Sequence, residues 1–129
     1  MPRPAKTLLA ALALAAISVA APAHAEVLRS GKIKGASGHT TTGTVAIVRD
    51  GGSVKVVFSD DYTLDNAPDP YVAFGSASKF AKGTDFAKMS STRGGQTYKV
   101  PGSLDASKYD AVWLWCKRFG VPLGYATLK

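Results

Sequence analysis

A period of two in the bulky apolar side chains marks a pair of β-strands near the middle of the chain. In residues 44–49 the side chains of Val45 and Ile47 share one face of an extended strand, and in 54–59 every second residue, from Val54 to Phe58, is apolar. The four residues between them read Asp-Gly-Gly-Ser, and glycine tolerates the positive φ of a tight turn. The pattern predicts an antiparallel β-hairpin.

Similar short runs, separated by Gly, Pro, Asp and Ser, predict further strands along the chain. These runs are 26–34, 71–74, 96–100, 111–119 and 121–128. Pro68 and Pro70 cannot donate to a strand ladder, so they mark the entry to a strand. Residues 76–95 are small and polar, which predicts a long connection with at most one helical turn. The predicted fold is an all-β antiparallel sandwich of about seven short strands.

The first 25 residues have the pattern of a secretory signal peptide. Two basic residues precede an uncharged apolar run at 8–21, and Ala-His-Ala at 23–25 has the form that signal peptidase accepts. The run is shorter than the roughly 20 residues that span a bilayer. We therefore expect cleavage before Glu26, a single domain over 26–129, no membrane span after cleavage, and a periplasmic or secreted location.

Composition then narrows the function classes. The chain carries 16 Lys and Arg against 9 Asp and Glu, but the basic residues are scattered rather than gathered with aromatics on one face. Nucleic acid is therefore not an expected partner. The chain has one cysteine, which excludes an internal disulfide and multi-cysteine zinc sites. Four Asp residues at 60, 61, 65 and 69 have ordinary turn positions without EF-hand spacing, so no metal site is predicted.

Three stretches together resemble a known family. They are 39–48 (HTTTGTVAIV), the Asp-Asp-Tyr and Pro-Asp-Pro-Tyr turns within 60–72, and 109–121 (YDAVWLWCKRFGV). These are similar to the DM-thirteen domain, an electron-transfer family related to the DOMON haem-binding sandwiches. Pro70 departs from the apolar residue that is common in the family after the Pro-Asp turn.

The resemblance implies a DOMON-like β-sandwich with a redox role centred on Cys116, as a bare thiol or through a bound group such as haem. His39 matches a histidine that often precedes the family's Ser/Thr-Gly-Thr strand. A redox or binding module is favoured over a turnover enzyme, because no nucleophile and base stand at a motif spacing.

The residues themselves leave two interpretations of Cys116 open. Strand alternation places Cys116 on the same face as Val112 and Leu114, which favours a buried and inert thiol. Lys117 and Arg118 follow directly, and neighbouring cations favour the reactive thiolate of an accessible cysteine. A free thiol in an exported protein also calls for an explanation.

Haem would need axial ligands, and the chain after residue 25 offers His39, Met89 and Cys116. The sequence lacks Cys-x-x-Cys-His, so covalent c-type attachment is excluded. The alternatives are an exposed loop histidine and a methionine that anchors a loop to the core. Apart from haem, the sequence indicates no particular cofactor. It also does not identify a redox partner or a protein partner.

The aromatic residues have two interpretations as well. Trp113 and Trp115 share the face opposite Cys116, with tyrosines at 98, 109 and 125 as candidate neighbours. Core aromatics are the ordinary interpretation, and a floor for a flat cofactor or partner is the functional one. Tyr109 also has the position of a corner tyrosine whose hydroxyl ties back to backbone. The alternative function is a non-catalytic module that binds a protein, a glycan or an envelope surface.

Overall fold

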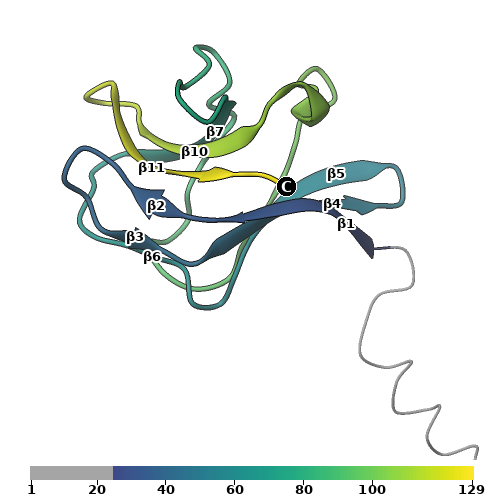
Figure 1. The fold of residues 1–129 in the computed structure, drawn as a ribbon, viewed down its shortest axis with the longest axis horizontal. Helices are drawn as coiled ribbons and strands as arrows, with labels where there is room; N and C mark the ends of the chain where they lie inside the picture. The colour runs from purple at the N-terminus through teal and green to yellow at the C-terminus, as the bar shows by residue number, and fades with distance from the viewer. Residues whose placement is uncertain (1–24) are drawn as a thin grey trace, which may run out of the picture.

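The computed structural model describes residues 25–129, which fold as two antiparallel sheets packed face to face (Figure 1). The described part contains eleven strands and one short 3-10 helix. The predicted all-β sandwich is therefore confirmed. The predicted signal peptide lies outside the described residues except for Ala25, which is the first residue of strand β1.

The first sheet has four strands in the order β1-β4-β5-β9. Their bounds are β1 Ala25–Lys32, β4 Thr44–Asp50, β5 Ser53–Phe58 and β9 Gln96–Lys99. The predicted hairpin forms β4 and β5, with Val45 opposite Phe58 and Ile47 opposite Val56. Gly51 takes a φ of 64° in its turn, as the sequence predicts.

The second sheet has five strands in the order β2-β11-β10-β7-β8. Their bounds are β2 Lys34–Gly35, β11 Val121–Thr127, β10 Ala111–Cys116, β7 Pro70–Gly75 and β8 Ala87–Lys88. Strand β7 begins at Pro70, which confirms the prediction that this proline marks a strand entry.

A third, two-stranded sheet closes one end of the sandwich. It consists of β3 (Thr41–Thr42) and β6 (Thr63–Leu64). The buried hydroxyl of Thr41 donates to the carbonyl of Leu123 over 2.9 Å, which ties this small sheet to β11. In Figure 1 the pair lies at the left of the molecule, away from the β4–β5 turn on the right.

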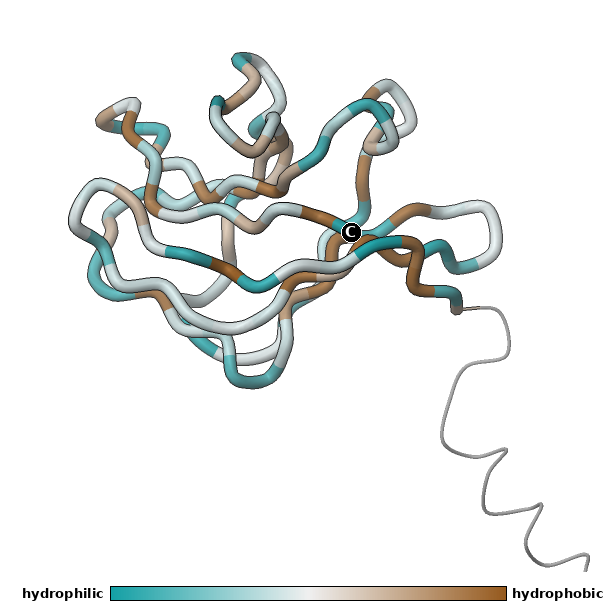
Figure 2. Tube along the Cα trace, in the orientation of Figure 1, coloured by the Kyte–Doolittle hydropathy of each residue, from teal (hydrophilic) through white to brown (hydrophobic). Residues whose placement is uncertain are grey.

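The core forms where the inner faces of the two sheets meet. Its largest fully buried members come from both sheets and include Ile47, Phe58, Phe74 and Leu114. Apolar segments run along strands that face this core, and hydrophilic ones gather in the peripheral loops (Figure 2). Burial of apolar surface against water is the main term that holds such a sandwich together.

Several details differ from the predicted elements. The seven strands of four or more residues match the seven predicted runs, while the four two-residue strands were not predicted. The stretch 76–95 holds β8 and an isolated bridge between Gly75 and Phe80 rather than a helical turn. The helical turn lies instead at η2 (Ala106–Lys108), where the Asp105 side chain accepts from the Ser107 N–H. Strand β10 ends at Cys116, before the predicted limit of 119.

The last residue of the chain pairs with the first strand. Ser30 and Lys129 exchange two backbone hydrogen bonds, of 3.0 and 2.9 Å. This seam joins β1 of the first sheet to the segment that follows β11 of the second. Within residues 25–129 no helix is long and apolar enough to cross a membrane.

Candidate functional site

Cys116 is the last residue of β10 and is 1% exposed. It lies opposite Pro70 of β7 and opposite Val121 of β11. Val112, Leu114 and Cys116 are all buried in the main core. The face predicted from strand alternation is therefore confirmed, and the sulfur is enclosed by apolar side chains.

The cation that directly follows Cys116 in the sequence, Lys117, lies away from its sulfur. The Lys117 ammonium lies 4.8 Å from the centroid of the Tyr71 ring and 3.5 Å from a carboxylate oxygen of Asp85. Tyr71 is opposite Trp115, so this ammonium is on the outer face of the sheet. The sheet therefore lies between the Lys117 ammonium and the Cys116 sulfur, and the closeness of these two residues in the sequence does not bring the two groups together.

Met89 follows β8 directly and packs into the same core. Its N–H donates to the carbonyl of Pro70 over 2.8 Å, so Cys116, Pro70 and Met89 belong to successive segments of one sheet. The side chain is 6% exposed, and its sulfur accepts a hydrogen bond of 3.4 Å from the Tyr62 hydroxyl. Burial, and to a lesser degree the nearby Tyr98, raise the pKa of Tyr62 above its ordinary value, so this phenol stays a donor.

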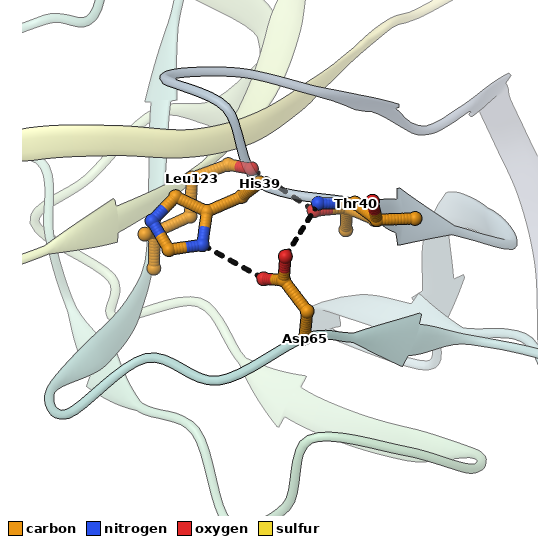
Figure 3. A network of polar contacts seen from close by, with 5 residues as sticks. His39, Thr40, Asp65 and Leu123 are labelled. Atoms are coloured by element: carbon orange, nitrogen blue, oxygen red, sulfur yellow. Dashed lines mark hydrogen bonds and ion pairs between the residues drawn. The ribbon is translucent and has the colours of Figure 1, made fainter.

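His39 lies in the loop between β2 and β3, outside the core. Its Nδ1 is 2.7 Å from Asp65 Oδ1, and the other carboxylate oxygen accepts from the Thr40 N–H over 2.8 Å (Figure 3). The backbone hydrogen bond from Thr40, and then the one from His39, hold the pKa of Asp65 below its usual value. Since Asp65 directly follows β6, this cluster fastens the β2–β3 loop to the end of the small sheet.

The three predicted ligand residues do not form a haem site in this arrangement. Cys116 and Met89 are packed among core side chains, and the Met89 sulfur already accepts from Tyr62. His39 is engaged with Asp65 in a loop. A flat macrocycle between these groups would displace the core packing that holds the sheets together. Haem binding by these three residues therefore stays a prediction that this packing does not support.

Comparison with known protein families shows to which family the chain belongs. The model of one family, described as Electron transfer DM13, matches residues 33–128. The chain belongs to the DM13 family. No curated protein and no solved structure matches the chain. The resemblance expected from the motifs at 39–48, 60–72 and 109–121 is thereby confirmed.

The DM13 domain also carries an aromatic outer face on its five-stranded sheet. Trp115 stacks on Phe80 with ring centroids 3.8 Å apart, and Trp113 stacks on Tyr125 at 4.7 Å. Trp113 is 6% exposed and donates from its indole N–H to the Ser76 carbonyl over 2.9 Å. Its burial confirms the core interpretation in part, but these rings form a second cluster outside the sheet rather than part of the main core.

Of the tyrosines predicted to accompany the tryptophans, only Tyr125 does so. Tyr98 belongs to the other sheet, where it packs against Phe58. Tyr109 stacks on Phe74, and its backbone carbonyl accepts a hydrogen bond from Arg29. Within the described residues the Tyr109 hydroxyl makes no hydrogen bond, so the predicted tie of a corner tyrosine is not formed by that hydroxyl.

A shallow hollow of about 330 Å³ lies beside the outer aromatic rings of the DM13 domain. Lys79, Phe80, Trp113, Trp115 and Pro122 line most of it. Sequence reasoning raised an aromatic floor as one interpretation, but it could not find Phe80, which reaches this face from the loop after β7. Within residues 25–129 no group of three or more His, Cys, Asp and Glu side chains is arranged to hold a metal ion.

Proposed function

We propose that the protein is an exported electron-transfer domain whose redox role depends on Cys116. The family match to residues 33–128 is the observation that carries the electron-transfer part of this proposal. Cys116 is the one thiol of the chain. The leader-like pattern of residues 1–25 supports export.

The enclosed sulfur restricts the chemistry that Cys116 can perform. With one cysteine in the chain, a disulfide can form only with a second molecule: the Cys116 thiolate attacks a partner disulfide, forms a mixed disulfide, and one partner thiol leaves. This exchange needs contact between sulfur atoms. At 1% exposure that contact requires the end of the β10–β11 hairpin to open.

The turn beyond Cys116 supports contact with a partner at this end of the sheet. Residues 117–120 are all exposed, and the Phe119 side chain, 65% exposed, is one of the two large apolar side chains on the surface of the described residues. Exposed aromatic side chains are common anchors in protein interfaces. A partner that binds Phe119 would therefore be positioned beside the strand end that must open.

The decisive experiment follows mixed-disulfide formation on the purified protein in native buffer. The protein is incubated with oxidised glutathione, and the adduct is followed by mass spectrometry. The proposal expects an adduct on Cys116 in the folded protein, lost in Cys116→Ala. The control is the double variant Cys116→Ala, Ser103→Cys, which places the one thiol at an exposed loop position. It gives the rate of adduct formation for an unhindered thiol. An adduct that forms only as fast as global unfolding allows would overturn the thiol role.

A binding module is the second candidate function, and the burial of Cys116 favours it. A buried free cysteine behaves as a small apolar side chain and needs no redox task. Absence of native-state exchange, together with a spectrum that shows only Trp and Tyr absorption before and after dithionite, would select this candidate. A Soret band that shifts on reduction would instead establish bound haem, and it would contradict the tight packing around Cys116 and Met89.

A further inference from the structure

A hollow of about 620 Å³ opens at the end of the sandwich opposite the small β3–β6 sheet. The β4–β5 turn borders it on one side, and the segment 101–107, which leads into and includes most of η2, borders it on the other. Figure 1 shows both segments on the right of the molecule. Volumes of this size are typical of small-molecule sites.

The floor of this end hollow is apolar. Side chains from β1, β4, β5 and the segment after β9 form it: Leu28, Ile47, Val54, Val100 and Leu104. Ile47 is fully buried, so the hollow reaches the main core. An apolar ligand body would remove this floor from water, which favours binding.

Two arginines stand over the floor. Arg29 is opposite Ile47 and Arg49 is opposite Val54, and directly opposite residues of an antiparallel pair point to the same side. Both arginines therefore belong to the inward-facing side of the four-stranded sheet. Both line the hollow.

Backbone carbonyls rather than a carboxylate hold Arg29 in place. Its two terminal nitrogens donate to the carbonyls of Tyr109 and Ala106 over 2.6 and 2.8 Å. A guanidinium carries five N–H groups, so donors remain after these two bonds. Within the described residues neither Arg29 nor Arg49 is within ion-pair distance of an acidic side chain.

The acidic groups near the hollow do not cancel this charge. Asp105 lines it, but its carboxylate accepts from the Ser107 N–H and hydroxyl over 3.0 and 2.6 Å. Glu26 is opposite Arg49 in the β1–β4 register and is exposed, yet it does not line the hollow. The two inward-facing guanidinium groups of Arg29 and Arg49 outnumber the one carboxylate of the lining.

We propose that this end hollow binds a small organic anion in which one carboxylate is joined to an apolar body. The carboxylate accepts from the free N–H groups of Arg29 and Arg49, since a planar guanidinium matches a carboxylate in two parallel hydrogen bonds. The apolar body lies on the floor formed by β1, β4 and β5. The site is at the opposite end of the fold from Cys116, so it is separate from the proposed redox role.

The test uses three probes with the purified protein and NMR titration of its backbone amides. Octanoate carries both features of the proposed ligand, 1-octanol keeps the apolar body without the charge, and acetate keeps the charge without the body. Octanoate is expected to shift amides at the hollow saturably, with an affinity at least about tenfold above that of either control. Equal affinity for octanoate and one of the controls would overturn the proposal.

Two variants then test whether Arg49 supplies positive charge to the octanoate carboxylate. Arg49→Gln is expected to weaken octanoate binding about tenfold, whereas Lys82→Gln, which removes an equal charge from an exposed loop outside the hollow, leaves it unchanged. An equal loss in both variants would show nonspecific attraction and refute the site. Arg49 is exposed, so its replacement spares the core, and the three probes decide the matter without it. None of these readouts depends on electron transfer.

Discussion

The Tyr62 hydroxyl donates a hydrogen bond to the sulfur of Met89 across 3.4 Å inside the core. The two side chains join the segment before β6 to the segment after β8. The pair explains the place of Met89 in the fold: its sulfur serves as the acceptor for a phenol that burial has removed from water. It is a structural role, and it accounts for a residue that the sequence offered as a haem ligand.

Met89→Leu should destabilise the protein by about 1–3 kcal/mol, because it leaves the buried Tyr62 hydroxyl without its acceptor. Tyr62→Phe combined with Met89→Leu should recover much of that loss, since both polar partners are then gone. Urea unfolding of the single and double variants measures the coupling between the two sites. Purely additive losses would mean that the hydrogen bond contributes nothing to stability.

Cys116→Ser should cost about 1–3 kcal/mol of unfolding free energy, because a hydroxyl replaces a sulfur in an apolar surround. Cys116→Ala keeps the site apolar, but it removes core volume and leaves a small cavity. Chemical denaturation of both variants gives the comparison. Serine and alanine variants with wild-type stability would contradict the tight enclosure of this side chain.

Gly75→Ala should destabilise the five-stranded sheet. A Cβ at this position would lie 2.3 Å from the Lys79 carbonyl oxygen and 2.6 Å from the Trp113 indole nitrogen. Relief of that overlap costs about 1–3 kcal/mol and should also alter the tryptophan fluorescence. Gly102→Ala is the matched control, because nothing lies within 4 Å of its added methyl group. Equal effects of the two substitutions would refute the close approach at Gly75.

The His39–Asp65 cluster should make the free energy of unfolding depend on pH in the acidic range. The pKa of Asp65 is lowered in the folded protein from an ordinary value of 3.8, so the folded state binds fewer protons than the unfolded state near that pH. Its contribution is present above about pH 3.8 and is lost as the pH falls through the folded pKa. Asp65→Asn removes the carboxylate.

Thermal unfolding between pH 2 and pH 7 tests this dependence. The Tm difference between wild type and Asp65→Asn should be largest near neutrality and should shrink as the pH falls below about 4. Asp110→Asn changes an exposed carboxylate whose side chain makes no hydrogen bond or ion pair in the described residues, and it should follow the wild-type curve. A Tm difference for Asp65→Asn that does not change with pH would contradict a stabilising role of the His39–Asp65 cluster.

The long strands could be predicted from the sequence because their signals are local. The alternation in β4 and β5 and the Asp-Gly-Gly-Ser turn between them depend only on neighbouring residues. The inward face of Cys116 followed from the same period of two. Strands of two residues, such as β3 and β6, were not predicted because so short a run has no periodicity to detect.

Contacts between distant residues could not be predicted from the sequence. Asp65 lies 26 positions from His39, and Phe80 reaches Trp115 from a separate loop. The cations at 117 and 118 suggested an activated thiol through proximity in the chain, yet the pleat places the Lys117 ammonium on the other side of the sheet. The family motif located Cys116 and indicated electron transfer, but it carried no information on the surroundings of the sulfur.

The seam between Ser30 and Lys129 has a consequence for the order in which the fold closes. Ser30 lies in β1 and Lys129 follows β11, so their two backbone hydrogen bonds join segments from opposite ends of the described residues. Pairings between residues so distant in the chain are slow to form, because the residues between them must first be ordered. We therefore expect the edge of β1 that meets Lys129 to be among the last parts of the fold to close when the unfolded protein refolds.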